Sequence, residues 1–313
     1  MNLNARAAAL CRHLADDAAR LRIELHTLEC GATVIDCGVK AVGGLEAGLL
    51  LARVCMADLA AIELAPGGDP LQPYVQVATD QPSLACMASQ YAGWEVKGEK
   101  FFAMGSGPMR AAAARETLFD DLGYREQASA CVGVLESGKL PTDEVCREIA
   151  AKCGIEPSQL TLLVAPTRSL AGTLQVVARS VETALHKLHE LKFDLNRIVS
   201  GWGVAPLPPP AKDDLAAIGR TNDAILYGGH AILHVRGDDA SLQEVGALTP
   251  SSASKDYGQP FAEIFAGYGH DFYQIDPQLF SPAMVTFINI ESGNSFRFGQ
   301  LNPAVIAKSF RHR

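Results

Sequence analysis

The chain has 313 residues, 48% hydrophobic and 20% charged, which is the balance of an ordinary soluble globular protein with room for two domains. A formal net charge of -8, with no basic stripe, argues against nucleic-acid binding. The eight cysteines form no CxxC pair, which favours reduced thiols over a disulfide framework or a zinc site.

No segment predicts membrane insertion or export. The first 22 residues carry charges throughout and lack the apolar core of a signal peptide. The most apolar helical stretch, 48–64, is interrupted by Arg53, Asp58 and Glu63, so it cannot span a bilayer. We therefore expect a soluble, cytoplasmic protein with no membrane partner.

Along the chain, apolar spacing and turn residues predict alternating helices and strands, a pattern typical of α/β proteins. The predicted helices are 5–22, 45–62, 109–120, 142–153, 171–192, 211–219 and 302–309. The predicted strands are 32–41, 73–79, 160–165, 224–235 and 284–290. The three successive prolines within 204–211, at 208–210, indicate either a crossing between structural halves or a rigid surface loop. We expect an α/β domain over 1–120 and another over 121–313, between which the chain crosses once or more.

The predicted helix 171–192 is the most informative element. Arg179, Glu182, His186 and His189 recur at helical spacing opposite an apolar stripe. Three interpretations stay open: a solvated face with an ion pair, a face on a cleft where the arginine holds the carboxylate ionised and the carboxylate handles protons, or a metal site at Glu182, His186 and His189. The spacing does not match HExxH, which weighs against the metal.

A second motif is the Gly-Ser-Gly-Pro run 105–108, which leads into a predicted helix. It is interpreted either as a helix start alone or as a cradle for a phosphate or carboxylate, with Arg110 nearby. Polar loops at 79–83, 221–229 and 251–258 are turn formers that also suit ligand contacts. The glycines of 43–48 do not match a dinucleotide fingerprint, and no P-loop or GxSxG elbow occurs. The residues alone do not define a reaction.

Six blocks of the sequence, in order, resemble methenyl-tetrahydromethanopterin cyclohydrolases. They lie at 79–96, 101–111, 178–191, 221–230, 251–265 and 268–283, and the resemblance extends from about residue 30 to Phe310. It implies two α/β domains with the pterin in the cleft between them, a homotrimer, and catalysis by Arg179 and Glu182. It implies no metal and no cofactor, since the tetrahydromethanopterin derivative is the substrate's own carrier.

From these blocks and residue chemistry, further contacts to the pterin are expected. These are Gly105, Ser106, Gly107, Arg110, Asn222, Tyr227, Ser252 and Lys255. The reaction implied is reversible hydrolysis of the methenyl bridge of 5,10-methenyl-tetrahydromethanopterin to the 5-formyl product. An isoelectric point near 5.5, without an extreme acidic surface, favours a bacterial role in formaldehyde oxidation of the methylotrophic type. The rivals are a metal-dependent hydrolase using Glu182, His186 and His189, and a non-catalytic pterin-binding protein.

Overall fold

The computed structural model describes residues 1–67 and 72–310. Contacts divide the chain into two compact units, Met1–Ala60 with Leu84–Gln175, and Ala61–Ser83 with Val176–Arg313. The chain therefore passes between the units three times, and the expected boundary after residue 120 lies inside the first unit. Each unit has a six-stranded mixed sheet with helices, which confirms the predicted α/β class with two domains.

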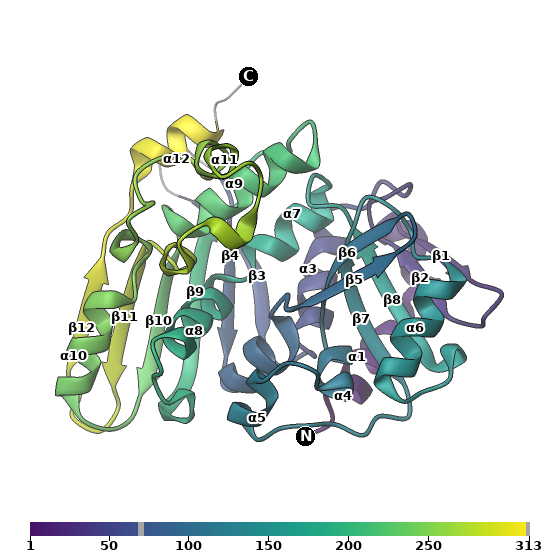
Figure 1. Ribbon diagram of the computed structural model, residues 1–313, viewed down its shortest axis with the longest axis horizontal. Coiled ribbons are helices and arrows are strands. Elements are labelled where there is room, and N and C mark those ends of the chain that lie inside the picture. The colour runs from purple at the N-terminus through teal and green to yellow at the C-terminus, as the bar shows by residue number, and fades with distance from the viewer. Residues whose placement is uncertain (68–71, 311–313) are drawn as a thin grey trace. The chain divides into compact units, whose positions relative to one another are not determined.

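The first unit contains the sheet β1-β2-β8-β7-β6-β5 (Figure 1). The strands β2, β8 and β7 run parallel, and the other neighbours run antiparallel. Its strands are β1 (Glu24–Thr27), β2 (Thr33–Asp36), β5 (Trp94–Gly98), β6 (Phe101–Ser106), β7 (Cys131–Glu136) and β8 (Leu160–Ala165). Its helices are α1 (Leu3–Cys11), α2 (Leu14–Leu21), α3 (Leu45–Cys55), α4 (Met109–Ala113), α5 (Leu118–Leu122) and α6 (Asp143–Cys153), with an eight-residue π-helix η1 (Ser83–Gln90) and a 3-10 turn η2 (Pro157–Gln159).

Both faces of this first sheet are buried. Alternate residues of β8 point to opposite sides, so Leu162 packs with α6 residues while Leu163 packs with α1 and α3 residues. Local capping fixes α6, because the Thr142 side chain accepts the N–H of Val145 and Gly154 closes the helix with φ +70°. The result is a three-layer α/β/α unit.

The second unit contains the sheet β12-β11-β10-β9-β4-β3, in which only β10 and β11 run parallel. Its strands are β3 (Ala61–Ala65), β4 (Tyr74–Thr79), β9 (Ile198–Pro206), β10 (His230–Val235), β11 (Met284–Asn289) and β12 (Ser295–Gly299). Its helices are α8 (Ser180–Glu190), α9 (Asp214–Leu226), α10 (Asp239–Leu248), α11 (Phe261–Gly267) and α12 (Pro303–Phe310), and α7 (Leu170–Val177) spans the boundary with the first unit. Its 3-10 turns are η3 (Leu195–Arg197), η4 (Ser251–Ala253), η5 (Phe272–Gln274) and η6 (Pro277–Leu279).

Several predicted elements differ from the structure. The expected strand 224–235 is wrong in its first part, where α9 continues to Leu226 and β10 begins only at His230. The expected helix 45–62 ends at Cys55, since 61–65 joins the second sheet as β3. The proline-rich stretch after β9 stays within the second unit. Within the described residues, no helix is both long and apolar enough to cross a membrane.

Candidate active site

The predicted helix 171–192 is interrupted near Ala178 and Arg179, which separates α7 from α8. Arg179 is the N-cap residue of α8, with φ -94° and ψ 13°, and Glu182 lies in the first turn. A carboxylate in this position interacts favourably with the exposed N–H groups and dipole of the helix start. The break therefore places the two residues that the resemblance singles out at one helix terminus.

Burial separates the interpretations of this helix. Arg179 is 5% exposed and Glu182 is 4% exposed, so neither faces bulk water. The interpretation as a fully solvated face is therefore wrong for this pair. Removing charged groups from water costs free energy unless they are paired or used, which favours the interpretation in which the carboxylate handles protons.

Two glycines of β9 allow the first turn of α8 to lie directly on the sheet. A Cβ atom at Gly203 would lie 2.4 Å from Ser180 Oγ and 2.8 Å from Val181 Cγ2. A Cβ atom at Gly201 would lie 2.8 Å from Val181 Cγ1. These contacts are shorter than van der Waals packing permits, so both positions require glycine if α8 is to keep its place. The Gly-Trp-Gly sequence at 201–203 is a signal that sequence reasoning missed.

Lys187 lies further along the same helix, and its burial was not predicted from the sequence. It is 1% exposed, and its Nζ donates a 2.6 Å hydrogen bond to the carbonyl of Gln278. Burial lowers the pKa of Lys187 to about 8. The bond fixes α8 to η6. The sequence pattern of α8 does not predict that Lys187 is buried, because most helical lysines face water.

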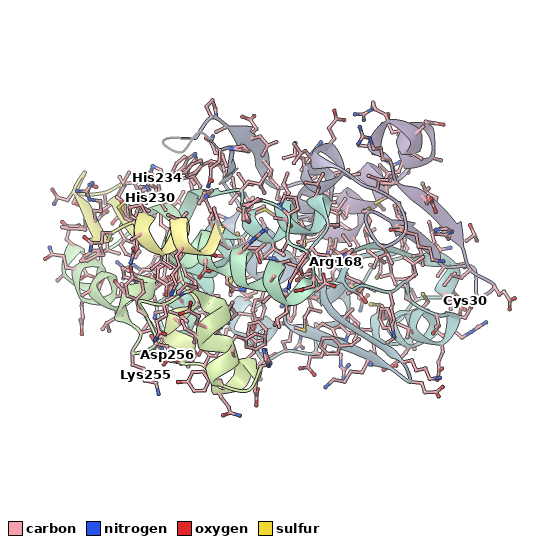
Figure 2. The ribbon with its side chains drawn as sticks, turned by 90° about the horizontal axis from the view of Figure 1, so that it is seen from above. Cys30, Arg168, His230, His234, Lys255 and Asp256 are labelled. Carbon is pink, nitrogen blue, oxygen red and sulfur yellow. The ribbon has the colours of Figure 1, made fainter. Side chains whose placement is uncertain are left out.

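A second group of predicted contacts lies at the C-terminal end of α9, beside the 251–258 loop. The hydroxyl of Tyr227 donates to the carbonyl of Gln259 at 2.5 Å and accepts the N–H of Gly258 at 3.1 Å. Its ring lies 5.0 Å from that of Tyr257. The structure thus brings Tyr227 to the loop that carries Ser252 and Lys255, both of which are exposed. Figure 2 labels Lys255 on this loop.

Asn222 and Asp223 stand one turn before Tyr227 on α9. The amide of Asn222 donates to the carbonyl of Ile218 at 2.9 Å, within its own helix. Asp223 is fully buried and accepts the N–H of Phe261 at 2.7 Å, which holds the start of α11. Burial raises the pKa of Asp223 to about 7. Asp223 was not predicted as a site residue, although it belongs to a block that carries the resemblance.

The remaining predicted contacts lie in the first unit. Gly105 and Ser106 end β6, and Ser106 Oγ lies 3.1 Å from Cys55 Sγ. Gly107 has φ +88° and donates to the carbonyl of Ser89 at 2.8 Å, so glycine is needed there for the turn. The helix α4 that follows has only five residues. The anion cradle stays a prediction, and a helix this short adds little support to it.

Arg110 is completely buried and is bound by protein groups. Its guanidinium forms an ion pair with Glu116 and donates to the carbonyls of Met87 and Ser89 at 2.9 and 3.3 Å. The rings of Tyr91 and Phe119 flank it, at 5.0 and 5.3 Å from the guanidinium carbon. These contacts give Arg110 a structural role at the end of η1, and a ligand contact for it stays a prediction.

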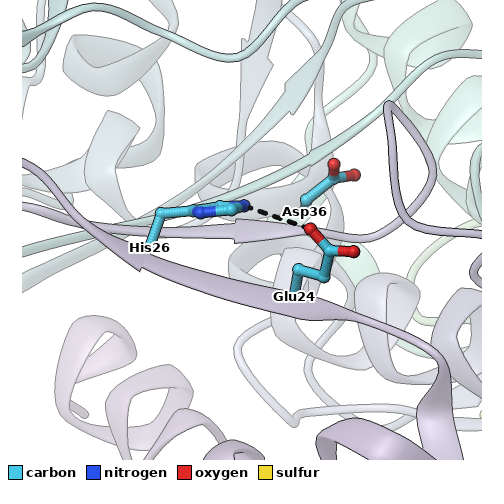
Figure 3. Close-up of side chains that lie close together, drawn as sticks. All are labelled: Glu24, His26 and Asp36. Carbon is cyan, nitrogen blue, oxygen red and sulfur yellow. Dashed lines mark ion pairs between the residues drawn. The ribbon is translucent and has the colours of Figure 1, made fainter.

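Possible metal ligands gather elsewhere. Among the described residues, a group of three potential metal ligands is formed by Glu24, His26 and Asp36 (Figure 3). Their donor atoms all lie within 4.8 Å of one another. The candidate set Glu182, His186 and His189 does not form such a group there. Asp36 already accepts four backbone N–H groups, two on each carboxylate oxygen, from residues 38–41. Its lone pairs are therefore used by the turn after β2.

Comparison with known proteins identifies close relatives over almost the whole length. Residues 2–310 match the family model described as Cyclohydrolase (MCH). The methenyltetrahydromethanopterin cyclohydrolase of Methylobacillus flagellatus is 51% identical over 303 residues, 96% of this chain and 93% of that protein. The proteins of the same name from Xanthobacter autotrophicus and Methanococcoides burtonii are 49% identical over 305 residues and 42% identical over 314 residues. These alignments cover 97% and 99% of this chain, and 90% and 98% of the two relatives.

Proposed function

This chain belongs to the cyclohydrolase (MCH) family, and we propose that it hydrolyses the methenyl bridge of 5,10-methenyl-tetrahydromethanopterin to the 5-formyl derivative. The observation that carries the proposal is the family match over residues 2–310, together with relatives named methenyltetrahydromethanopterin cyclohydrolase that align with 96% and 97% of this chain. The burial of Arg179 and Glu182 at one helix terminus supports their assignment as the catalytic pair.

The substrate makes the first step accessible without a resident cofactor. Its methenyl carbon lies between two nitrogens in a delocalised cation and is already electrophilic. In the proposed mechanism the Glu182 carboxylate removes a proton from water as the water oxygen bonds to that carbon. The product of this step is a neutral tetrahedral adduct, with the proton on Glu182.

Collapse of the adduct needs a proton on the departing nitrogen. Glu182 returns its proton there as the carbon–nitrogen bond breaks, and it then accepts the proton of the adduct's hydroxyl group as the formyl C=O forms. Release of this proton to solvent restores the carboxylate. The balance is one water consumed and one proton released, and each step is reversible.

Arg179 supports this cycle in two ways. A guanidinium beside a carboxylate favours its ionised form and orients it. A fixed positive charge also disfavours the cationic substrate more than the neutral adduct, so part of the unfavourable interaction disappears as the reaction proceeds.

Further parts of the proposal rest on the resemblance and on the composition. We propose a homotrimer in the cytoplasm that takes part in one-carbon metabolism, with formaldehyde oxidation as the pathway and a pterin substrate as the small-molecule partner. No metal or nucleotide cofactor enters the proposed steps.

The test is hydrolysis of methenyl-tetrahydromethanopterin by metal-stripped protein in the presence of a chelator, followed by loss of the methenyl absorbance in the near ultraviolet. The proposal expects the same rate with and without chelator. Activity that returns only on adding a divalent cation would favour the metal-dependent rival. Saturable substrate binding with no turnover under either condition would favour a pterin-binding protein.

A further inference from the structure

A buried cation lies on the helix that carries the proposed catalytic pair. Lys187 and Glu182 both belong to α8, and they are only 1% and 4% exposed. Their spacing puts them roughly 140° apart around an α-helix, so the two side chains contact different neighbours. Lysine is almost never fully buried unless its charge is matched, so the groups that surround Lys187 indicate its role.

Those groups belong to the turn η6 and to the residue before it. The Lys187 Nζ donates a 2.6 Å hydrogen bond to the carbonyl of Gln278. Burial lowers the pKa of Lys187 and the carboxylate of Asp276 raises it, so the ammonium and this carboxylate attract each other. Burial also opposes ionisation of Asp276, but hydrogen bonds to its carboxylate outweigh that effect and hold its pKa below the ordinary value. Two opposite charges therefore join α8 to η6.

The carboxylate of Asp276 continues this connection to the 251–258 loop. Its Oδ1 accepts the N–H of Gln278 at 3.1 Å, and its Oδ2 accepts the hydroxyl of Ser254 at 2.8 Å and the N–H of Lys255 at 3.2 Å. The Ser254 hydroxyl oxygen in turn accepts the N–H of Asp256 at 3.1 Å. One side chain at the start of η6 thus holds the middle of the loop, directly and through a hydroxyl group.

A return contact closes this network. The carboxylate of Asp256 accepts the backbone N–H of Asp276 on Oδ2 at 2.9 Å, and the hydroxyl of Tyr268 on Oδ1 at 2.9 Å. The loop and η6 therefore each supply a carboxylate to a backbone N–H of the other, which fixes their relative position at two points. Figure 2 labels Lys255 and Asp256 on this loop. Lys187 connects the network to α8.

We propose that Lys187 is a positioning residue, which holds the 251–258 loop in place for the substrate through the hydrogen bonds of η6. The loop carries Ser252 and Lys255, two of the expected contacts to the pterin. The inference rests on the proposed function and deepens it, because it connects substrate binding to the helix of the catalytic pair. Since β9 supports the first turn of α8 separately, loss of the network should weaken substrate binding more than proton transfer.

The first experiment compares Lys187→Met with wild type in steady-state hydrolysis of methenyl-tetrahydromethanopterin. Methionine has a similar length and no charge, and an apolar residue of matching size can replace a buried ion without loss of the fold. We expect KM to rise by about tenfold, with kcat within about twofold of wild type. Lys212→Met is the matched control, because the side chain of Lys212 is 88% exposed in the same unit. It should behave as wild type.

The second experiment asks whether Lys187 acts through the network. Ser254→Ala cuts the connection at its other end, so the double variant with Lys187→Met should have the KM of the more affected single variant. Hydrogen exchange of the 251–258 amides, followed by mass spectrometry without substrate, should be faster in both single variants and unchanged in Lys212→Met. Circular dichroism checks folding. If Lys187→Met does not fold, Asp276→Asn removes the facing charge instead and carries the same prediction.

Several results would contradict this role of Lys187. An unchanged KM, a loss confined to kcat, independent effects in the double variant, or wild-type exchange in the loop would each overturn it. A wild-type protein without turnover would instead overturn the proposed function. The exchange measurement would then still decide whether Lys187 holds the loop, so the two failures are distinguishable.

Discussion

Buried charged side chains in this protein are held in different ways. The guanidinium of Arg110 is matched by the carboxylate of Glu116, two carbonyls and two aromatic rings. Lys187 has a carbonyl partner, and burial lowers its pKa to about 8 because the charged ammonium is less stable there than in water. The carboxyl of Asp223 has its pKa raised to about 7, so it is partly protonated near neutral pH. Only Arg179 and Glu182 combine burial with a place in a proposed reaction.

Asp223 should make stability depend on pH. Its pKa is about 7 in the folded protein and near the ordinary 3.8 when unfolded, so the folded state binds more protons between these values. Stability contributed by this group is full below about pH 4 and is lost as the pH rises to 7. Asp223→Asn should remove this loss, reducing the difference in unfolding free energy between pH 5 and pH 8 by about 2 kcal/mol. Urea unfolding at the two pH values measures it, and an unchanged difference would contradict the assignment.

Arg110 should matter for stability more than for substrate binding. Arg110→Lys keeps the charge but loses the fork that meets Glu116 and the two carbonyls, so we expect about 2 to 3 kcal/mol of destabilisation with KM unchanged. Arg125→Lys is the control, because the Arg125–Asp120 pair is exposed and should contribute little. A raised KM in Arg110→Lys with wild-type stability would instead establish it as a ligand contact.

At the scale of elements, the position of the proposed catalytic pair depends on how β9 meets α8. The N-cap residue and first turn of α8 carry Arg179 and Glu182, and the glycines of β9 allow this turn to lie against the strand. The strand thus positions the site without contributing a reacting group.

Gly203→Ala should displace the first turn of α8. The added Cβ would meet Ser180 Cβ at 3.2 Å as well as Oγ and Val181, so rotating one side chain does not relieve the contact. We expect about 1 to 3 kcal/mol of destabilisation, typical of overpacking, together with a kcat reduced more than KM. Gly267→Ala is the control, since a Cβ there meets nothing within 4 Å. Wild-type kcat in Gly203→Ala would show that β9 does not position the site.

Elements were predictable where the local pattern was strong. The strands β4, β8 and β11 and the helix α6 lie within a residue of their predicted ranges, because short apolar runs and the Thr142 and Gly154 caps are local signals. The strand β9 was missed because glycines and a proline dilute its pattern. The break before α8 contains no Pro or Gly, so no local sequence signal predicts it. Helical spacing singled out Arg179 and Glu182 and the resemblance supplied their proposed role, whereas the burial of Lys187 and Asp223 depends on tertiary packing that no local pattern encodes.

At the scale of the whole molecule, neither unit is a single continuous segment of the chain. The residues of β3 and β4 belong to the second sheet, although the first unit resumes after them at residue 84. In the first sheet, β7 and β8 lie between β2 and β6. The sheet therefore requires residues from both sides of position 120.

Fragments cut at the expected boundary should not fold. A fragment 1–120 lacks β7 and β8 at the centre of its sheet, and a fragment 121–313 lacks β3 and β4 at the edge of the other. We expect fragment 1–120 to be insoluble or to show no cooperative unfolding by circular dichroism, and 121–313 to be much less stable than the full chain. A cooperative transition in fragment 1–120 would contradict the observed strand order.

The measurement that tests the central claim most directly is single-turnover and steady-state hydrolysis by Glu182→Gln, with substrate affinity measured separately. The variant keeps the shape of the side chain but cannot carry the proton, so kcat should fall by about a thousandfold while the Kd for the methenyl substrate changes little. Glu190→Gln, at the exposed end of the same helix, should behave as wild type. A Glu182→Gln enzyme with kcat within tenfold of wild type would contradict the role of Glu182 as the proton carrier.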